Sequence, residues 1–409
     1  MSNTGGLCSA SESTMAGLSF LCCGVLLFAS ILLNPISCHA RFRPRDAPHK
    51  ALFVFGDSLF DPGNNQYLND SSQEGAGATV FPYGETFFKR PTGRLCDGRT
   101  VPDLIAQFAN LPILPPYLQP RDHQFTDGAN FASAGAGVLD NTHPGSINLR
   151  LQLSYFKDVV KSLREKLGEE EAKRVLMNAV YLFSIGGNDY FGFSQRNRDA
   201  SEESEGQYVQ SVIGNLTSVL KEICDLGGRK IAFQNVGPLG CVPMTKVFDP
   251  SIGSGCAKEP SSLARQHNRY LAIFLKQLET QLPGFKYAIF DYYIALGDRV
   301  ANPSKYGFKE GKAACCGSGP YRGMNCGRIE KGTQMFELCS NPAEYVWFDG
   351  GHTTERANTQ LAQLLWDGAP PFLIKLSFVL FWLIMRCDYL ILSSYMALHI
   401  PFYVGFLWS

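Results

Sequence analysis

Short runs of β-branched, aromatic and other apolar residues recur along the chain, with segments of helical periodicity between several of them. The runs are 52–55, 129–132, 180–185, 231–236 and 287–290. Apolar residues repeat at three- and four-residue steps over 212–223 and again over 263–278, which is typical of helices packed against a sheet. Alternating strands and helices predict a parallel sheet covered on both faces, which is an α/β fold.

Three of the predicted strands end in polar or glycine-rich turns. These turns are Gly56–Ser58, Ser133–Gly137 and Gly186–Asp189. Because the carboxyl ends of parallel strands share one edge of a sheet, where ligands bind, we expect these turns to meet. Ser58 either closes a turn or acts as a nucleophile, and Asn188 either caps a helix or donates its amide N–H to a developing oxyanion.

A serine nucleophile needs a base, and two of the seven histidines have an aspartate three residues earlier. The pairs are Asp140 with His143 and Asp349 with His352. At this spacing the carboxylate can hold one imidazole nitrogen while the other faces the serine. We favour Asp349 and His352, because they follow an apolar run and precede a helical pattern over 354–366. The other pair lies in a loop with proline and glycine.

Other enzyme and partner classes find no support in the sequence. The G-x-S-x-G nucleophile elbow of α/β-hydrolases does not occur, and Gly135-Ala136-Gly137 lacks the third glycine of the dinucleotide fingerprint. The 37 basic and 37 acidic residues cancel to a formal net charge of +0, so the sequence predicts no nucleic-acid partner.

The N-terminal end of the chain differs from the middle, which we interpret as one α/β domain over 41–368. The uncharged apolar stretch 18–33 and the small residues before the proposed cleavage point predict a signal peptide over 1–40, and therefore secretion. An uncleaved signal anchor is the alternative, and Met15 is a second candidate for the start of translation.

The C-terminal segment 369–409 is atypically rich in large apolar residues. Within it, 389–408 is uncharged and about as long as a membrane span, but His399 and Pro401 weaken that interpretation. A membrane anchor, which would give the protein a membrane contact, a buried extra element and an error in the gene model are the alternatives. We favour the last, because the composition changes abruptly at Gly368.

Secretion changes how the cysteines and asparagines are interpreted. Eight of the 13 cysteines lie between Cys96 and Cys339, and an even number in an oxidising compartment favours disulfides over metal ligation. The sequence therefore predicts no metal site. The sequons at Asn69 and Asn215 are candidate glycosylation sites.

Several spaced motifs together resemble those of plant-type GDSL esterases/lipases of the SGNH hydrolase superfamily. They are GDSL at Gly56–Leu59, GGND at Gly186–Asp189, NVGPLGCVP at Asn235–Pro243, Tyr306–Gly317, and the Asp349, His352 pair. The resemblance spans residues 51–368. It implies a flavodoxin-like three-layer α/β/α sandwich with a five-stranded parallel sheet, the SGNH hydrolase fold, and hydrolysis of carboxylic esters without a cofactor.

The resemblance also implies a role for each site residue. Ser58 is the expected nucleophile, His352 the base and Asp349 the residue that orients it. The Ser58 N–H, Gly135 and Asn188 are the expected oxyanion hole. The family usually has proline after its histidine, whereas this chain has Thr353, which predicts a looser turn with unchanged chemistry.

Disulfide pairing can be predicted only in part. We expect Cys241 to pair with Cys256, closing a short loop. Cys315 and Cys316 are expected to pair with Cys326 and Cys339 in an order left open, and Cys96 and Cys224 either pair or stay free.

The predicted function is that of a secreted serine esterase/lipase that hydrolyses acyl esters or lipids through a Ser-His-Asp triad and an acyl-enzyme. One alternative is an acyltransferase that uses the same acyl-enzyme. The other is a secreted defence or binding protein whose catalysis is incidental. The natural substrate, its acyl-chain length and the oligomeric state are left open by the sequence.

Overall fold

The computed structural model describes residues 50–68, 76–120, 124–197, 199–249, 252–253, 255–368 and 372–374. All of them belong to the second of two compact units, Met1–Ala47 and Pro48–Ser409. Three sequence predictions lie outside the described residues: the signal peptide over 1–40, the sequon at Asn69 and the apolar run 389–408.

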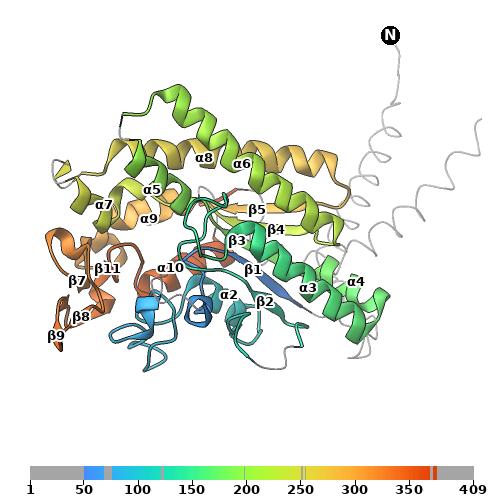
Figure 1. Ribbon diagram of the computed structural model, residues 1–409, viewed down its shortest axis with the longest axis horizontal. Coiled ribbons are helices and arrows are strands. Elements are labelled where there is room, and N and C mark those ends of the chain that lie inside the picture. The colour runs from blue at the N-terminus through green and yellow to red at the C-terminus, as the bar shows by residue number, and fades with distance from the viewer. Residues whose placement is uncertain are drawn as a thin grey trace, which may run out of the picture. The chain divides into compact units, whose positions relative to one another are not determined.

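Five parallel strands form the centre of the fold, as predicted (Figure 1). They are β1 (Leu52–Gly56), β2 (Gly128–Asn130), β3 (Val180–Ser184), β4 (Lys230–Gln234) and β5 (Lys286–Phe290). Their order across the sheet is β5-β4-β3-β1-β2, the flavodoxin-like order, and each strand begins and ends within two residues of the predicted run. The order reverses between β1 and β3, so a crevice for ligands is expected beside the end of β1.

A short sixth strand extends the sheet at its β5 edge. β12 (Leu373–Ile374) runs antiparallel to β5, and the Asp291 N–H donates to the Phe372 carbonyl at 2.8 Å. Residues that the sequence assigns to the C-terminal segment therefore continue the sheet and satisfy part of an edge that would otherwise be free to pair.

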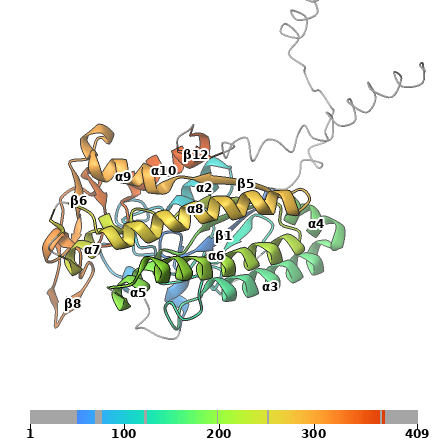
Figure 2. The same cartoon turned by 90° about the horizontal axis from the view of Figure 1, so that it is seen from above.

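Helices cover both faces of the sheet, giving three layers (Figures 1 and 2). Alternate side chains point to opposite faces of a strand, so Phe53 and Phe55 pack on one side and Leu52 and Val54 on the other. The first face packs against α3 (Leu149–Leu167), α4 (Glu169–Asn178), α6 (Glu202–Asp225) and α8 (Lys258–Gln281). The second packs against α2 (Val101–Phe108), α9 (Tyr292–Ala301) and α10 (Glu355–Asp367).

The remaining elements are short and lie mostly at the end of the molecule that carries β7, β8 and β9 (Figure 1). The helices are α5 (Gly187–Arg196) and α7 (Pro243–Phe248). The strands are β6 (Glu310–Ala314), β7 (Cys316–Gly317), β8 (Ile329–Glu330), β9 (Thr333–Gln334), β10 (Glu337–Leu338) and β11 (Tyr345–Trp347). The 3₁₀ helices are Asn64–Tyr67, Ala76–Thr79, Leu239–Cys241, Pro303–Tyr306, Pro320–Arg322 and Pro342–Glu344.

Three disulfides cross-link this less regular region. The predicted bond between Cys241 and Cys256 is confirmed, and the open order resolves as Cys315–Cys339 and Cys316–Cys326. Cys96 and Cys224 are both buried and free, so they do not pair. Each disulfide limits the unfolded chain and typically contributes about 2–4 kcal/mol, which helps a region with little regular structure.

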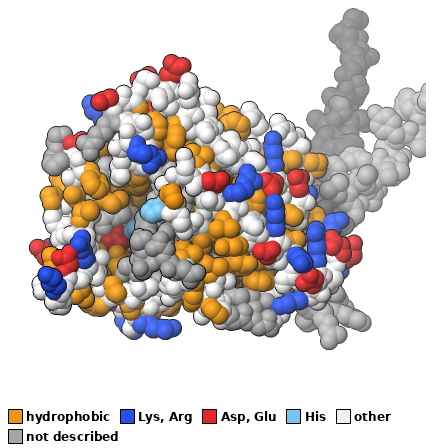
Figure 3. All heavy atoms as spheres, viewed as in Figure 1, with side chains coloured by type: hydrophobic (Ala, Val, Ile, Leu, Met, Phe, Trp, Pro, Cys, Tyr) orange, Lys and Arg blue, Asp and Glu red, His pale blue; other side chains and the backbone are white. Residues whose placement is uncertain are grey.

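The surface carries no single-sign field on the face shown in Figure 3, where acidic and basic side chains are interspersed with hydrophobic ones. This agrees with the net charge of +0. Within the described ranges, no helix combines the length and apolar character needed to cross a bilayer.

Candidate active site

Ser58 lies in the turn that follows β1, next to the crevice. Gly56 must be glycine here, because a Cβ would lie 2.7 Å from the Ser184 carbonyl oxygen. The buried Gln152 side chain fixes the strand end, since it accepts from the Gly56 N–H at 2.9 Å and donates to the Gly56 carbonyl at 2.8 Å. Ser58 is 7% exposed. The serine is thus presented by a strand end whose backbone is held on both sides.

The residues after Ser58 hold the loop that carries Gly135, a role that the sequence did not reveal. The Asp61 carboxylate accepts from the Gly63 and Asn64 N–H groups and, through its other oxygen, from the Ala134 N–H at 2.8 Å. Asn64 donates to the carbonyls of Asn130, at the end of β2, and of Ala132 in the loop, and Asn65 donates to Ala134 at 2.9 Å. Burial raises the pKa of Asp61 to about 6, against the opposing effect of these backbone donors.

Gly135 adopts a left-handed conformation, with φ of +78°, which favours glycine. Among the described residues that line the cavity beside Ser58, Asn188 is present and Gly135 is not. The two are connected, because the Asn188 amide donates to the carbonyl of the neighbouring Ala136 at 3.0 Å. The helix-cap alternative for Asn188 is wrong, since Gly186 is the N-cap of α5 and Asn188 lies within the helix.

His352 and Asp349 lie together in the turn after β11. Nδ1 of His352 donates to Oδ1 of Asp349 at 2.7 Å, and that oxygen also accepts from the His352 and Gly351 N–H groups at 2.9 and 2.8 Å. Gly350 allows the tight turn, because a Cβ there would lie 2.1 Å from the Gly323 carbonyl oxygen. When Nδ1 carries the proton of this bond, the lone pair that can accept a proton is on Nε2.

The second oxygen of Asp349 binds Tyr83, which no sequence pattern had indicated. The Tyr83 hydroxyl donates to Oδ2 at 2.9 Å, and its ring packs edge-on against Phe348 at 5.4 Å between centroids. Burial by itself raises the pKa of the Asp349 carboxyl, but His352, the backbone donors and Tyr83 together hold it below its ordinary value. Asp349 is therefore an ionised, fully bonded carboxylate beside the imidazole.

Thr353, where the family usually has proline, is buried and its hydroxyl donates to Oδ1 of Asn358 at 2.5 Å. The Thr354 N–H donates to the Val346 carbonyl, and the Phe348 N–H donates to the His352 carbonyl at 2.7 Å. Hydrogen bonds thus constrain the turn in place of a proline ring.

The competing pair lies elsewhere. Asp140 is exposed and His143 half-buried, and neither is among the described residues that line the cavity beside Ser58. The loop they occupy is tied instead to α5, because the buried Asp189 carboxylate accepts from the Val138 and Leu139 N–H groups at 2.9 and 3.0 Å.

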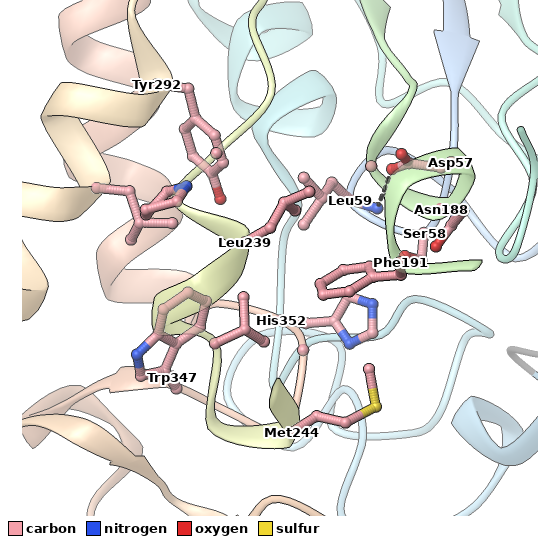
Figure 4. Close-up of a pocket in the computed structure, with 16 residues that line it drawn as sticks. Asp57, Ser58, Leu59, Asn188, Phe191, Leu239, Met244, Tyr292, Trp347 and His352 are labelled. Carbon is pink, nitrogen blue, oxygen red and sulfur yellow. Dashed lines mark hydrogen bonds between the residues drawn. The ribbon is translucent and has the colours of Figure 1, made fainter. Parts of the chain in front are cut away.

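Ser58, Asn188 and His352 line one cavity of about 70 Å³, counted as space open to the centre of a water molecule (Figure 4). Its other walls are largely apolar and include Phe191, Leu239, Val242, Met244, Tyr292, Leu296 and Trp347. A hydroxyl, an imidazole with a bound carboxylate and an amide donor around one small space can support nucleophilic attack on a carbonyl group. Within the described ranges, no group of three or more His, Cys, Asp or Glu side chains could hold a metal ion.

The chain is similar to several known proteins. The chain is 50% identical over 323 residues to "GDSL esterase/lipase 1" of Arabidopsis thaliana, covering 78% of this chain and 86% of the relative. It is 49% identical over 320 residues to "GDSL lipase" of Tanacetum cinerariifolium, covering 78% and 84%. A solved structure of a GDSL-like lipase from Parabacteroides merdae covers 77% of this chain and 93% of its own, at 11% identity and a TM-score of 0.35.

The match to the family itself is longer than any single motif. Residues 52–365 match the family described as GDSL-like Lipase/Acylhydrolase, and this range includes the five parallel strands, helices of both layers and the turn that carries His352. The chain therefore belongs to the GDSL-like lipase/acylhydrolase family.

Proposed function

We propose that this protein is a secreted serine esterase in which Ser58 is the nucleophile, His352 the general base and Asp349 the residue that orients it. The observation that carries the proposal is the 2.7 Å bond between His352 Nδ1 and the buried Asp349, beside a cavity that Ser58 also lines. The esterase and lipase names of the similar proteins support the same reaction class.

The reaction begins when Nε2 of His352 takes the proton of the Ser58 hydroxyl and the serine oxygen attacks the ester carbonyl. The new imidazolium then gives its proton to the departing alkoxide, leaving an acyl group on Ser58. In the second half of the reaction, His352 takes a proton from a water molecule, which attacks the acyl group on Ser58. The imidazolium then returns the proton to the serine oxygen, and the carboxylic acid is released. Asp349 holds the imidazole in the required tautomer and stabilises its charged form.

The oxyanion formed during attack needs donors that are already in place. We assign this role to the Ser58 N–H, the Asn188 amide and the Gly135 N–H. Asn188 is suited to it, because its bond to Ala136 fixes the amide at the edge of the cavity without changing its charge. Glycine at 135 supports close approach of the backbone to a ligand.

Secretion is supported by the three disulfides, because such bonds persist in oxidising compartments. Asn215 lies exposed on α6, so within the described residues it remains the candidate for glycosylation.

The proposal is tested with p-nitrophenyl acetate and butyrate and with a fluorophosphonate that labels active serines. The native protein should hydrolyse the esters and carry one label, which peptide mass spectrometry should locate on Ser58. Ser58→Ala should lose both while keeping its melting temperature, because loss of the nucleophile costs on the order of 10⁶ in rate. Activity retained by a folded Ser58→Ala variant would contradict the proposal. Labelled acyl groups recovered on an added polyol instead of water would favour the acyltransferase alternative.

A further inference from the structure

We propose that the site is divided by Phe191 and Met244 into a small acyl pocket and a wide groove for the alcohol part of the ester. The substrates are then esters of short acyl chains with bulky, hydroxyl-bearing alcohols. This inference rests on the proposed function and names its substrate class.

The acyl pocket is the 70 Å³ cavity beside Ser58. A single water needs roughly 10–15 Å³ by the same measure, so this cavity holds about five to seven groups of that size. Its walls are held in place by packing. Leu239 belongs to the hydrophobic core on one face of the sheet, and Leu296 and Trp347 belong to the core on the other face. The Trp347 ring is further fixed by a bond from its indole N–H to the Gly311 carbonyl at 3.0 Å.

The groove is a separate hollow of about 710 Å³, ten times larger by the same measure. Its described lining is mixed: the polar side chains are Ser194 and Gln195 on α5, Thr245 and Asp249 at α7, and Lys258 and Glu259 at the start of α8, and the apolar ones include Phe248, Ile252 and Pro260. The Cys241–Cys256 disulfide and the bond from the Ala257 N–H to the Gly240 carbonyl, 2.9 Å long, anchor its α8 wall.

Phe191 and Met244 are the described residues that line both spaces. In Figure 4 the imidazole of His352 lies between these two side chains. Met244 is also tied to the turn before His352, since its N–H donates to the Gly350 carbonyl at 2.8 Å. The groove therefore lies on the histidine side of the cavity.

That position decides which half of the ester occupies which space. The imidazole must protonate the departing alkoxide and deprotonate the incoming nucleophile, so the alcohol has to leave on the histidine side. The polar side chains of the groove suit the hydroxyl groups of a bulky alcohol, and its apolar residues suit the carbon skeleton that carries them. The apolar cavity suits the acyl chain, and its small volume limits that chain to a few carbons.

The acyl half is tested with p-nitrophenyl esters of two, four, eight and twelve carbons, comparing kcat/KM. The native protein should prefer two and four carbons. Phe191→Ala and Met244→Ala open the pocket into the groove and should raise the ratio for eight over four carbons by at least about 10-fold, since a methylene in an apolar pocket changes discrimination by that order. Met244→Leu keeps the volume, and Phe248→Ala alters the groove alone, so both should leave this ratio within a few-fold of native.

The alcohol half is tested with two monoacetates that differ only in the alcohol, ethyl acetate and 6-O-acetylglucose. The native protein should have the higher kcat/KM for the sugar ester. Ser194→Leu narrows the groove and should lower that value more than the value for ethyl acetate. Melting temperatures confirm that each variant is folded.

The outcomes separate this inference from the proposed function. Native enzyme that hydrolyses esters but prefers twelve carbons, or alanine variants that leave the chain-length ratio unchanged, overturns the division of the site while the esterase proposal stands. A folded native protein that hydrolyses none of these esters overturns both.

Discussion

The turn that carries Ser58 and the turn that carries His352 line one cavity but are held by different forces. β1 is a central strand, paired on both sides and buried on both faces, so hydrophobic packing positions the nucleophile and the Gln152 hydrogen bonds secure the strand end. β11 has three residues and pairs with β6 alone among the described strands, with an irregular register. The base is fixed mainly by hydrogen bonds and cross-links.

Two of the disulfides are connected to the base through short backbone hydrogen bonds. The Cys315 and Cys316 N–H groups donate to the Trp347 and Phe348 carbonyls at 3.0 and 2.7 Å, directly before Asp349. Both cysteines are in disulfides. The comparison teaches that one side of the site depends on the core, whereas the other depends on individual polar contacts that single substitutions can remove.

The largest expected effect on the base side is that of Asp349→Asn. An amide cannot hold the imidazole in the required tautomer or stabilise its charge, so kcat should fall on the order of 10⁴-fold with the fold retained. Steady-state kinetics with p-nitrophenyl butyrate measure it. Asp140→Asn and His143→Ala are matched controls and should change kcat only a few-fold. If His143→Ala abolished activity while His352→Ala kept it, the assignment of the base would be wrong.

On the nucleophile side, Asn188→Ala should lower kcat by about 10²–10³, because one oxyanion donor is lost while Ser58 and its strand stay in place. Circular dichroism and labelling by the fluorophosphonate check that the strand end is intact. An effect on KM alone, with kcat unchanged, would show that Asn188 binds the substrate without acting on the transition state.

Tyr83→Phe sharpens the comparison, because it removes one hydroxyl from the base side and keeps the ring against Phe348. A hydrogen bond to a charged group contributes about 1.5–3 kcal/mol, which is equivalent to about 10- to 150-fold in rate, so kcat should fall by at most that factor. The pKa of Asp349 is held low in the folded protein, so its contribution to stability is present above its unfolded value and is lost as pH falls through the folded value.

Tyr83→Phe should therefore destabilise the protein at pH 7 and have a smaller effect at pH 3, as urea unfolding at the two pH values would measure. A merely structural role of the hydroxyl predicts the same loss at both. Equal losses of stability, with kcat unchanged, would remove Tyr83 from the site.

The smallest expected effect concerns the helix that presents Asn188. His267 lies 3.0 Å from where a Cβ on Gly186 would stand, and its Nδ1 is 2.7 Å from the Tyr190 hydroxyl. Burial lowers the pKa of His267 to about 3. Its neutral form thus contributes stability that is present above about 6.5, the ordinary histidine value, and is lost as pH falls toward 3.

His267→Gln should show a smaller difference in unfolding free energy between pH 7.5 and pH 5 than the native protein does. The raised pKa of Asp61 acts with the opposite sign, since its contribution is lost as pH rises through about 6, and it is unchanged in the variant. An equal pH dependence in the native protein and the variant would show that another group sets the acid sensitivity.

The sequence alone determined the features that depend on interactions between residues close together in the chain. Hydrophobic periodicity placed five strands within two residues, because alternation and helical repeats are local properties of the chain. The Asp349, His352 pair was also local, since a spacing of three residues brings the two side chains within hydrogen-bond reach in one turn. The disulfide between Cys241 and Cys256 closes a short loop for the same reason.

Only the tertiary structure decided the contacts between distant segments. Tyr83 reaches Asp349 across 266 residues, and Asp61 reaches Ala134 across 73, with no spacing in the sequence to mark either pair. The pairing of Cys315 and Cys316 depended on the directions in which adjacent side chains point, which backbone geometry alone specifies. The two unequal spaces on either side of Phe191 and Met244 exist because α5, α7, α8 and β11 meet there, and the sizes of such spaces follow from packing that no single segment encodes.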